Sequence, residues 1–596
     1  MNDKNKSLFS EFSPVSKQDW MERVTADLKG ADYNKTLVWK NLSQINIEPF
    51  YTAEDTINCL KNTGENSQSL VNYRSIVVTT AENGNKLAAK AIEEGINGII
   101  FELKENVSAA TLLNGLDLNE ITVSFKLTSN AVAFTTDLVA FAKGKNLRGF
   151  INTGIISNYV TTGSFDASQV EITAELVKLT ANFSNFKAIT ISGTEYLDSG
   201  ANQVQEVAYT LNSLVFLVEK LTEKGITAQD IFNNLNVQLA IGLEYFVEIG
   251  KFRAFNNLLT EVAAKYGVVD FSNTITAKTS IWSKSVTDAE TNLLRCTTEA
   301  MSAILGNVDG VLIDAYDKEF KNPSDFSSRI AGNITTILRE ESYFGKVSNP
   351  VDGSYYIEEV SVKIAEKALE LFKAIEAEGG FYTAFQNETI QQQIAEIRLQ
   401  KLKLISQRRT PMVGINKYPN LMEKLDSSIL SAGEIANPKV LTPRRASLEI
   451  EAIRKTTEEF VTATKKRPIV ELSSYGNLTM RKARAAFAYD FIGVSGYNVL
   501  QEKSFESAEK AAELSAKSDS NVVVMCSSDE DYNETALAFV KTFRALNSTK
   551  VLLIAGAPTN MDELTAAGLD GCVNLRSDVI TTISSIQSKV QKTIKS

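Results

Sequence analysis

The chain has 596 residues, and its 62 basic against 72 acidic side chains give a net charge of −10. This acidic balance argues against nucleic acid or an anionic membrane as a general partner, and 43% hydrophobic residues are typical of a soluble globular protein. The composition includes no histidine, which is the commonest metal ligand and the usual proton carrier near neutral pH. The chain therefore cannot by itself form His-bearing zinc, iron or haem sites, or a nucleophile activated by an imidazole.

The cysteines and the N-terminus indicate where the protein works. The first 20 residues hold no apolar run that could serve as the core of a signal peptide. No later segment offers about 18 uncharged apolar residues for a membrane span. The spacing of the four cysteines predicts neither a disulfide framework nor a zinc knuckle, so we expect a cytoplasmic protein. These cysteines are Cys59, Cys296, Cys526 and Cys572.

Residues 1–50 are expected to form an N-terminal arm. Its amphipathic stretch predicts a helix that Ser16 or Asp19 would cap. Trp20 and Leu28 would be the apolar anchors of this helix. Such an arm is usually fixed by packing, and an exposed partner-binding helix is the alternative.

Residues 51–400 alternate short β-rich runs with amphipathic helical patterns. Eight strands alternating with helices predict a (β/α)8 TIM barrel, with an open doubly wound sheet as the alternative. The chain is therefore expected to belong to the α/β class. The predicted strands are 75–80, 98–104, 121–127, 149–154, 188–194, 237–243, 273–279 and 310–316.

A helical linker is predicted over residues 401–465, followed by a second α/β unit over 466–596. Five shorter strands with intervening helices in this unit indicate a flavodoxin-like domain. The basic residues Lys465, Lys466 and Arg467 are interpreted as a solvated edge of the linker.

Chemistry in a TIM barrel is expected at the carboxyl ends of its strands. Scattered acidic groups there are expected to be solvated or paired, although two close carboxylates would share acid and base roles. The candidates are Glu102, Thr194, Glu195, Asp198, Glu244, Asp314 and Asp317.

Two further segments leave alternatives open. In strand 273–279, Thr274, Thr276 and Lys278 alternate with apolar residues, so one side of the strand is polar. That side either faces the interior of the barrel or contacts helices or a strand end.

In the second unit, a nucleotide or corrin is expected near the first loop, 473–479. This loop has no Gly-rich phosphate motif. Ser473, Ser474 and Thr479 have hydroxyl groups that can bind phosphate, but Thr479 is favoured as a helix cap.

Several ordered strings resemble the methylmalonyl-CoA mutase family, and together they extend over nearly the whole chain. The most specific run includes Arg329, Asn333, Glu340, Glu341 and the segment Asn349–Glu358. The resemblance implies an acyl-CoA-binding barrel joined to a cobalamin-binding domain, and the interconversion of methylmalonyl-CoA and succinyl-CoA with adenosylcobalamin. Strings that carry it are ISGTEYLDSGANQVQEVAYTL, LAIGLEYFVEIGKFRAF, SRIAGNITTILREESYFGKVSNPVDGSYYIEE and RPIVELSSYG.

Three departures separate this sequence from active members of that family. Thr194 and Glu195 stand where active members have Tyr-His. The stretch Ser473–Lys482 lacks the Asp-x-His-x-x-Gly motif whose histidine ligates cobalt. Gly332 follows Arg329-Ile-Ala where the family usually has arginine.

These losses resemble the small, non-catalytic subunit of bacterial heterodimeric mutases. The resemblance implies that a large catalytic subunit is the partner and binds adenosylcobalamin and substrate. We therefore assign no catalytic, cofactor-binding or metal-binding residue to this chain. The alternatives are a mutase active in its own right, with Glu195 as base, and a regulatory module that binds a CoA ester.

Overall fold

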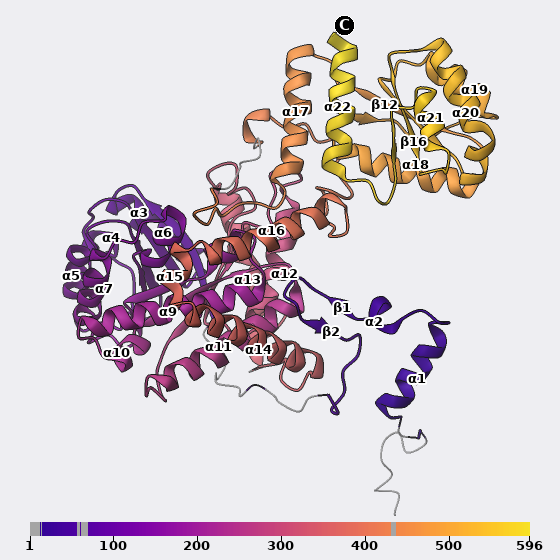
Figure 1. Cartoon of the computed structure of the whole chain (residues 1–596). Coiled ribbons are helices and arrows are strands. Elements are labelled where there is room, and N and C mark those ends of the chain that lie inside the picture. The colour runs from indigo at the N-terminus through magenta and orange to yellow at the C-terminus, as the bar shows by residue number, and fades with distance from the viewer. Residues whose placement is uncertain are drawn as a thin grey trace, which may run out of the picture.

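The computed structural model places an N-terminal arm, a large barrel and a C-terminal α/β unit in sequence along the chain (Figure 1). The described residues are 12–13, 15–55, 60, 70–347, 349–430 and 437–595. Cys59 lies outside them. Within these ranges, no helix combines the length and apolar character that crossing a lipid bilayer requires.

The arm begins with the predicted helix, α1 (Lys17–Asp27). Ser16 and Asp19 both act at its start, because each side chain accepts a hydrogen bond from the other residue's backbone N–H. None of the α1 side chains is fully buried, and Trp20 packs on Phe50 with ring centroids 5.0 Å apart. Figure 1 shows α1 projecting away from the barrel. A short helix and an antiparallel strand pair complete the arm: α2 (Tyr33–Thr36), β1 (Trp39–Lys40) and β2 (Asn46–Ile47).

The barrel is a nine-stranded sheet in the order β7-β6-β5-β4-β3-β11-β10-β9-β8. All of its pairs are parallel. All eight predicted strands are present. The ninth arises because β7 and β8, separated only by Ala188, pair with opposite neighbours and so connect the two sides of the barrel. The strands are β3 (Val71–Val78), β4 (Gly98–Leu103), β5 (Thr122–Leu127), β6 (Gly149–Asn152), β7 (Phe186–Lys187), β8 (Ile189–Ser192), β9 (Leu235–Ile241), β10 (Thr274–Thr279) and β11 (Gly310–Leu312).

Helices enclose the barrel because every second strand residue points outward and most of these residues are apolar. Phe101, Val237 and Ile275 belong to this outer core. The enclosing helices are α3 (Ala81–Glu93), α4 (Ala109–Leu112), α5 (Ala131–Phe141), α6 (Ile155–Thr162), α7 (Ser168–Leu179), α8 (Thr194–Asp198), α9 (Gln203–Glu223), α10 (Ala228–Asn233), α11 (Tyr245–Lys265) and α12 (Thr291–Leu305).

Further helices cover α9 and α11 from outside. The long helix α14 packs against both of them, which explains why α9 is buried along nearly its whole length. These additional helices are α14 (Tyr355–Ala377), α15 (Gly380–Gln386) and α16 (Thr389–Ser406). Helix α13 (Asp325–Glu340) packs instead against α12 and β3.

The C-terminal sheet has the order β13-β12-β15-β16-β17, with β14 also beside β12, and all pairs are parallel. One apolar core lies under α17, α18 and α22, and a second lies under α19, α20 and α21. The sheet is therefore covered on both faces. Its strands are β12 (Ile469–Ser474), β13 (Asn498–Val499), β14 (Lys503–Ser504), β15 (Val522–Cys526), β16 (Val551–Ala555) and β17 (Gly571–Val573). Its helices are α17 (Leu448–Thr464), α18 (Leu478–Gly493), α19 (Ala508–Ala516), α20 (Asp529–Leu546), α21 (Met561–Ala566) and α22 (Val579–Lys595).

Candidate functional site

The polar side of β10 faces the interior of the barrel, which resolves the first alternative left by the sequence. Thr274 and Thr276 both donate to Asn236 Oδ1 of β9, at 2.9 and 3.3 Å. Asn236 in turn donates to Thr190 Oγ1 at 3.3 Å, and Thr190 donates to the Ile151 carbonyl at 2.7 Å. Thr190 and Thr276 are buried and Thr274 is half-buried. Each hydroxyl group donates to an oxygen on another strand, which offsets the cost of its burial.

Apolar side chains fill the middle of the barrel. Tyr73, Ile100, Phe150 and Leu312 form a separate buried cluster inside the strands. The Tyr73 and Phe150 rings meet edge to face with centroids 5.8 Å apart. These side chains therefore occupy the axis of the barrel.

Charged residues at the carboxyl end of the barrel neutralise one another. Asp314 lies 2.6 Å from Lys318 Nζ and 3.8 Å from Lys278 Nζ. Against the effect of burial, Lys318 and Lys278 lower the pKa of Asp314, and Asp314 raises the pKa of Lys278. Glu102 accepts a 2.5 Å hydrogen bond from Ser75 and lies 3.7 Å from Lys126 Nζ. The expectation of paired acids is confirmed for Asp314 and Glu102.

Thr194 and Glu195 lie at the start of α8 and bond to the preceding strand. Ser192 Oγ donates to Glu195 Oε2 at 2.7 Å and lies 2.8 Å from Thr194 Oγ1. Glu195 is thus the hydrogen-bond acceptor of a local cluster with Ser192 and Thr194. The cluster contains neither an aromatic ring nor an imidazole donor.

Asp198 is a buried acid among the sequence candidates. It accepts hydrogen bonds from Ser280 Oγ at 2.5 Å and from the Ile281 N–H at 3.1 Å. Burial raises the pKa of Asp198 to about 6, and Lys278 opposes that rise. Because both hydrogen bonds tie the carboxylate to the loop after β10, Asp198 fixes that loop in position.

Glu244 and Asp317 lie in loops after β9 and β11, and no hydrogen bond or ion pair joins either of them to the paired charges described above. Burial raises the pKa of Glu244, and Lys401 opposes this effect. Asp317 is fully buried, 3.3 Å from Lys321 Nζ. Lys278 interacts electrostatically with Glu102, Glu195, Asp198 and Asp314. The structure therefore gathers four of the seven candidates around one cation, while Glu244 and Asp317 make separate contacts.

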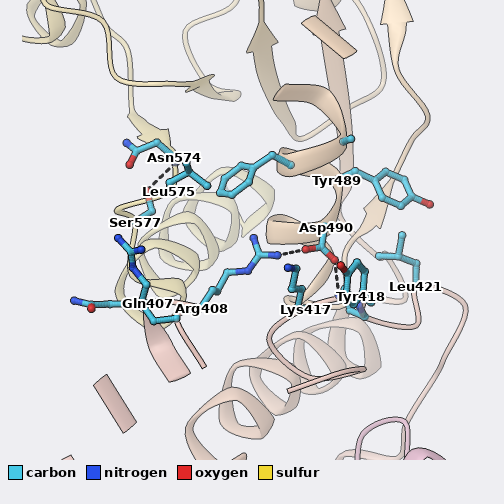
Figure 2. A pocket seen from close by; sticks show the side chains of 14 residues that line it. Gln407, Arg408, Lys417, Tyr418, Leu421, Tyr489, Asp490, Asn574, Leu575 and Ser577 are labelled. Carbon is cyan, nitrogen blue, oxygen red and sulfur yellow. Dashed lines mark hydrogen bonds and ion pairs between the residues drawn. The ribbon is translucent and has the colours of Figure 1, made fainter. Parts of the chain in front are cut away.

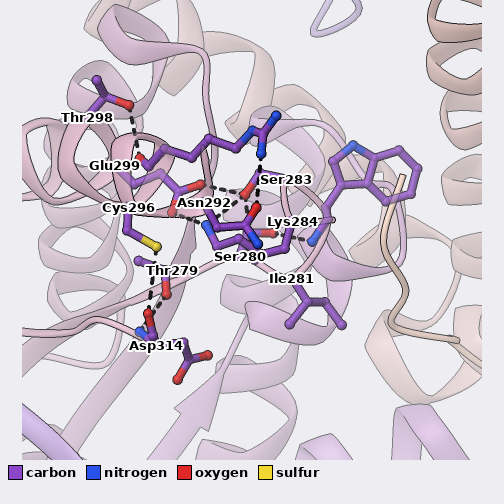
Figure 3. Close-up of polar contacts among 12 residues, drawn as sticks. Thr279, Ser280, Ile281, Ser283, Lys284, Asn292, Cys296, Thr298, Glu299 and Asp314 are labelled. Atoms are coloured by element: carbon purple, nitrogen blue, oxygen red, sulfur yellow. Dashed lines mark hydrogen bonds and ion pairs between the residues drawn. The ribbon is translucent and has the colours of Figure 1, made fainter. Parts of the chain in front are cut away.

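Sequence reasoning missed two buried lysine clusters. Lys251 Nζ lies 2.8 Å from Glu206 and 2.6 Å from Glu248, and all three side chains have no exposed surface. Lys251 follows Glu248 by three residues, a spacing from which an ion pair on one face of a helix could have been predicted. Lys284 Nζ lies 2.5 Å from Glu299 (Figure 3).

Cys296 lies beside the Lys284 cluster, and its Sγ lies 3.7 Å from the Asp314 carbonyl (Figure 3). Burial raises the pKa of the Cys296 thiol to about 12. The thiol is therefore uncharged at neutral pH and is not a nucleophile.

The family-specific segment Asn349–Glu358 is held by one arginine from α11. Arg253 donates to Asn349 Oδ1 at 3.1 Å and pairs with Asp352 at 2.9 Å and with Glu358 at 2.7 Å. Its side chain is only 8% exposed. The role of this segment in the structure is thus to join α14 to α11. Arg329 and Glu341 are exposed, Asn333 is half-buried, and Glu340 pairs with Arg339 at 2.8 Å.

A side chain at position 332 would displace the ends of two neighbouring side chains. A Cβ atom there would lie 2.8 Å from Ile96 Cδ1 and 3.1 Å from Arg74 Nη2. Arg74 reaches this position from β3, where it pairs with Glu94 at 2.6 Å and donates to the Ser328 carbonyl at 3.1 Å. The guanidinium of Arg74 therefore occupies the volume beside Gly332.

The first loop of the C-terminal unit is closed by an aspartate from α20. Asp531 Oδ2 accepts hydrogen bonds from the Asn477 N–H at 2.9 Å and from Ser527 Oγ at 2.7 Å. Against the effect of burial, hydrogen bonds from Ser527 and Asn477 lower the pKa of Asp531 to about 2. A Cβ at Gly476 would lie 2.2 Å from Asp531 Oδ2, so only glycine permits this approach.

Predictions for this loop and the preceding linker need correction. Asn477, not Thr479, caps α18, because its side chain accepts from the Met480 N–H. Ser473 and Ser474 are fully buried and are not available to a phosphate. Arg467 is not part of a solvated edge, since it pairs with Glu458 at 2.5 Å. Lys465 and Lys466 are exposed as predicted.

The described residues do not fit a cobalamin that needs a lower protein ligand. The loop that would supply the ligand has no imidazole and is bonded to Asp531. Its backbone is thereby held against α20 rather than presented to a ligand.

The similarity of this chain to known proteins covers both α/β units. A family model described as methylmalonyl-CoA mutase matches residues 95–482. The methylmalonyl-CoA mutase small subunit of Porphyromonas gingivalis (strain W83) is 31% identical over 623 aligned residues, covering 99% of each chain. The small subunit of Streptomyces virginiae is 28% identical, covering 78% of this chain and 76% of its own. The methylmalonyl-CoA mutase of Escherichia coli (strain K12) is 28% identical, covering 61% of this chain and 52% of its own.

Proposed function

This chain belongs to the methylmalonyl-CoA mutase family and groups with its small subunits, and we propose that it is the non-catalytic subunit of a heterodimeric, adenosylcobalamin-dependent methylmalonyl-CoA mutase. In this proposal the chain stabilises a large catalytic subunit, which binds adenosylcobalamin and interconverts methylmalonyl-CoA and succinyl-CoA. The cofactor supplies the radical chemistry there, and this chain contributes no residue to it.

The packed interior of the barrel is the observation that carries the proposal. Tyr73, Ile100, Phe150 and Leu312 occupy the space that an acyl-CoA would need to cross the barrel. The same packing opposes the alternative of a regulatory module with a CoA ester inside the barrel. Glu195 is bonded to Ser192, which opposes its use as the base of an independent mutase.

The C-terminal unit also supports the proposal that this chain is a non-catalytic mutase subunit. Counting the five main strands in chain order and setting β14 aside, the sheet order is 2-1-3-4-5, which is that of flavodoxin-like domains. We therefore propose that residues 466–596 are a flavodoxin-like, cobalamin-binding-type domain that has lost its cobalt ligand. The division into residues 1–50, 51–400, 401–465 and 466–596 remains a prediction, as does a cytoplasmic location.

A series of linked aromatic rings suggests where the large subunit binds. Trp20 contacts Phe50, Tyr51 contacts Tyr356, and Tyr356 contacts Phe246, with ring centroids 5.0 to 5.7 Å apart. Phe50 and Phe246 are 42% and 50% exposed. Exposed aromatic side chains gathered in one region are typical of protein interfaces, and an obligate interface buries more than about 2,000 Å².

Co-expression with the large subunit of the same enzyme tests the proposal. We expect the two chains to co-purify in equal amounts, with turnover by the complex and none by this chain alone when adenosylcobalamin is supplied. Phe246→Asp should weaken the complex, whereas Phe326→Asp, at a 67% exposed position of α13, is the matched control. Turnover by the isolated chain, or a large subunit that is soluble and fully active alone, would contradict the proposal.

A further inference from the structure

A cavity of about 630 Å³ lies between the start of the linker and the C-terminal unit. Its walls come from three segments that are distant in sequence: linker residues 407–421, the second half of α18 and the loop 574–577 (Figure 2). This volume is in the range of sites for organic small molecules. The cavity is separate from the barrel mouth and from the closed loop at Asp531.

One side of the cavity is apolar and partly aromatic. Phe487, Leu421 and Pro419 line it, and Tyr418 and Leu575 extend it at 64% and 77% exposure. Such exposed apolar surface beside a cavity of this size favours a ligand with a flat or apolar body. It does not favour a small inorganic ion alone.

The polar side of the cavity carries an excess of positive charge. Arg408, Arg409 and Lys417 line it, against one acid, Asp490. Asp490 already pairs with Arg408 Nη2 and accepts the Tyr418 N–H at 2.5 Å. Two of the three cations therefore have no acidic partner among the lining residues.

Arg408 has donors directed at no protein acceptor. Its side chain is 10% exposed, and its Nε and Nη1 atoms are buried without a hydrogen-bond partner among the described residues. Its guanidinium lies over the Phe487 ring, with Cζ 5.2 Å from the ring centroid. Buried donors of this kind are costly unless an acceptor binds them, and a guanidinium suits the paired oxygens of a phosphate.

Arg408 and Tyr418, both in the linker, have φ angles of 59° and 55°, in the left-handed region. Arg408 follows Gln407, the C-cap of α16, a position at which helices commonly end in this conformation.

We propose that this cavity binds a nucleoside phosphate. The phosphate contacts Arg408 and Arg409, with Lys417 adding positive charge. The base lies against the aromatic wall formed by Phe487 and Tyr418. A free nucleotide and the adenosine phosphate end of coenzyme A both combine a base with a phosphate, so the proposal covers both ligands.

Calorimetric titration of the full-length chain, alone and in complex with its large subunit, tests this site. The probes are ADP, coenzyme A, adenosine and inorganic phosphate. We expect ADP or coenzyme A to bind. Adenosine, which lacks the phosphate, and inorganic phosphate, which lacks the base, should bind at least about tenfold more weakly. Tighter binding of coenzyme A than ADP would identify coenzyme A as the source, and the reverse would identify a free nucleotide.

Variants locate the binding in the cavity. Arg408→Lys retains a positive charge for Asp490 but removes the guanidinium fork, and Arg409→Ala removes an exposed cation. Each should weaken ADP or coenzyme A at least about tenfold. Leu575→Trp should block the cavity without affecting the core, because Leu575 is exposed.

Lys403→Ala, at an exposed position of α16 that does not line the cavity, is the matched control and should bind like wild type. No heat with either nucleotide at millimolar concentration would overturn the proposal. Equal affinity in Arg409→Ala, Leu575→Trp and Lys403→Ala would also overturn it, since the ligand would then bind elsewhere.

Discussion

Tyr73 and Phe150 meet edge to face inside the barrel, with their ring centroids 5.8 Å apart, although they are carried by strands at different positions in the sheet. The pair forms the centre of the apolar cluster that separates the two ends of the barrel. The pair therefore belongs to the packing that stabilises the fold.

Phe150→Ala should destabilise the barrel by about 3–5 kcal/mol, because the ring is 2% exposed and its removal leaves a cavity. Urea denaturation of the full chain measures this as a lower midpoint. Phe326→Ala, at a 67% exposed position, should change the free energy of unfolding by less than about 0.5 kcal/mol. Similar midpoints for the two variants would contradict the packing role of Phe150.

Restoring the family's residues after β8 should not restore activity. The double variant Thr194→Tyr, Glu195→His replaces the side chains that bond to Ser192, but it leaves the barrel filled and the C-terminal loop bonded to Asp531. The isolated variant, assayed for succinyl-CoA with adenosylcobalamin and methylmalonyl-CoA, should give no product above that of the wild-type chain. Measurable turnover would show that these two positions alone had silenced the chain.

Asp309→Asn should stabilise the protein at neutral pH. Burial raises the pKa of Asp309 to about 6. Between pH 4 and 6 the folded chain therefore retains a proton that the unfolded chain releases, and the free energy of unfolding falls as the pH rises through this window. The amide avoids this ionisation and still accepts the 2.7 Å bond from the Ile275 N–H.

The gain of Asp309→Asn over wild type should be near zero at pH 4 and on the order of 2 kcal/mol at pH 7. Denaturation curves across that range measure it. A constant difference at every pH would mean that Asp309 does not titrate in this window.

Lys251→Met should strongly destabilise the barrel. It leaves Glu206 and Glu248 buried side by side without their cation, a change that costs about 3–5 kcal/mol. Thermal denaturation compares it with Lys220→Met, which removes an exposed ion pair on α9 and should cost less than about 1 kcal/mol. Comparable losses would show that the buried cluster adds nothing beyond a surface pair.

Asp490→Ala should release the start of the linker from α18. It leaves the guanidinium of Arg408 buried without its acid, at a cost of about 3–5 kcal/mol to this contact. Limited trypsin digestion should then cut faster within residues 407–421. Asp529→Ala, which removes the 59% exposed partner of Arg484, is the control. Unchanged digestion in Asp490→Ala would mean that other contacts hold the linker.

Local patterns predicted the elements well, because each depends on residues within one strand or one helical turn. All eight barrel strands, the capped helix α1 and the parallel C-terminal strands were predicted in order. The cap of α18 was predicted two residues too late, since Asn477 and Thr479 are both suitable caps and only the loop geometry selects between them.

The sequence by itself determined the range of chemistry open to this protein, because a chain without histidine lacks an imidazole in any conformation. It also determined the succession of strands and helices and the family. Only the tertiary structure decided that Tyr73 meets Phe150, that Thr276 faces inward, and that Arg253 holds the segment Asn349–Glu358. These contacts depend on strand register and on closure of the barrel, which bring together residues that no local pattern relates.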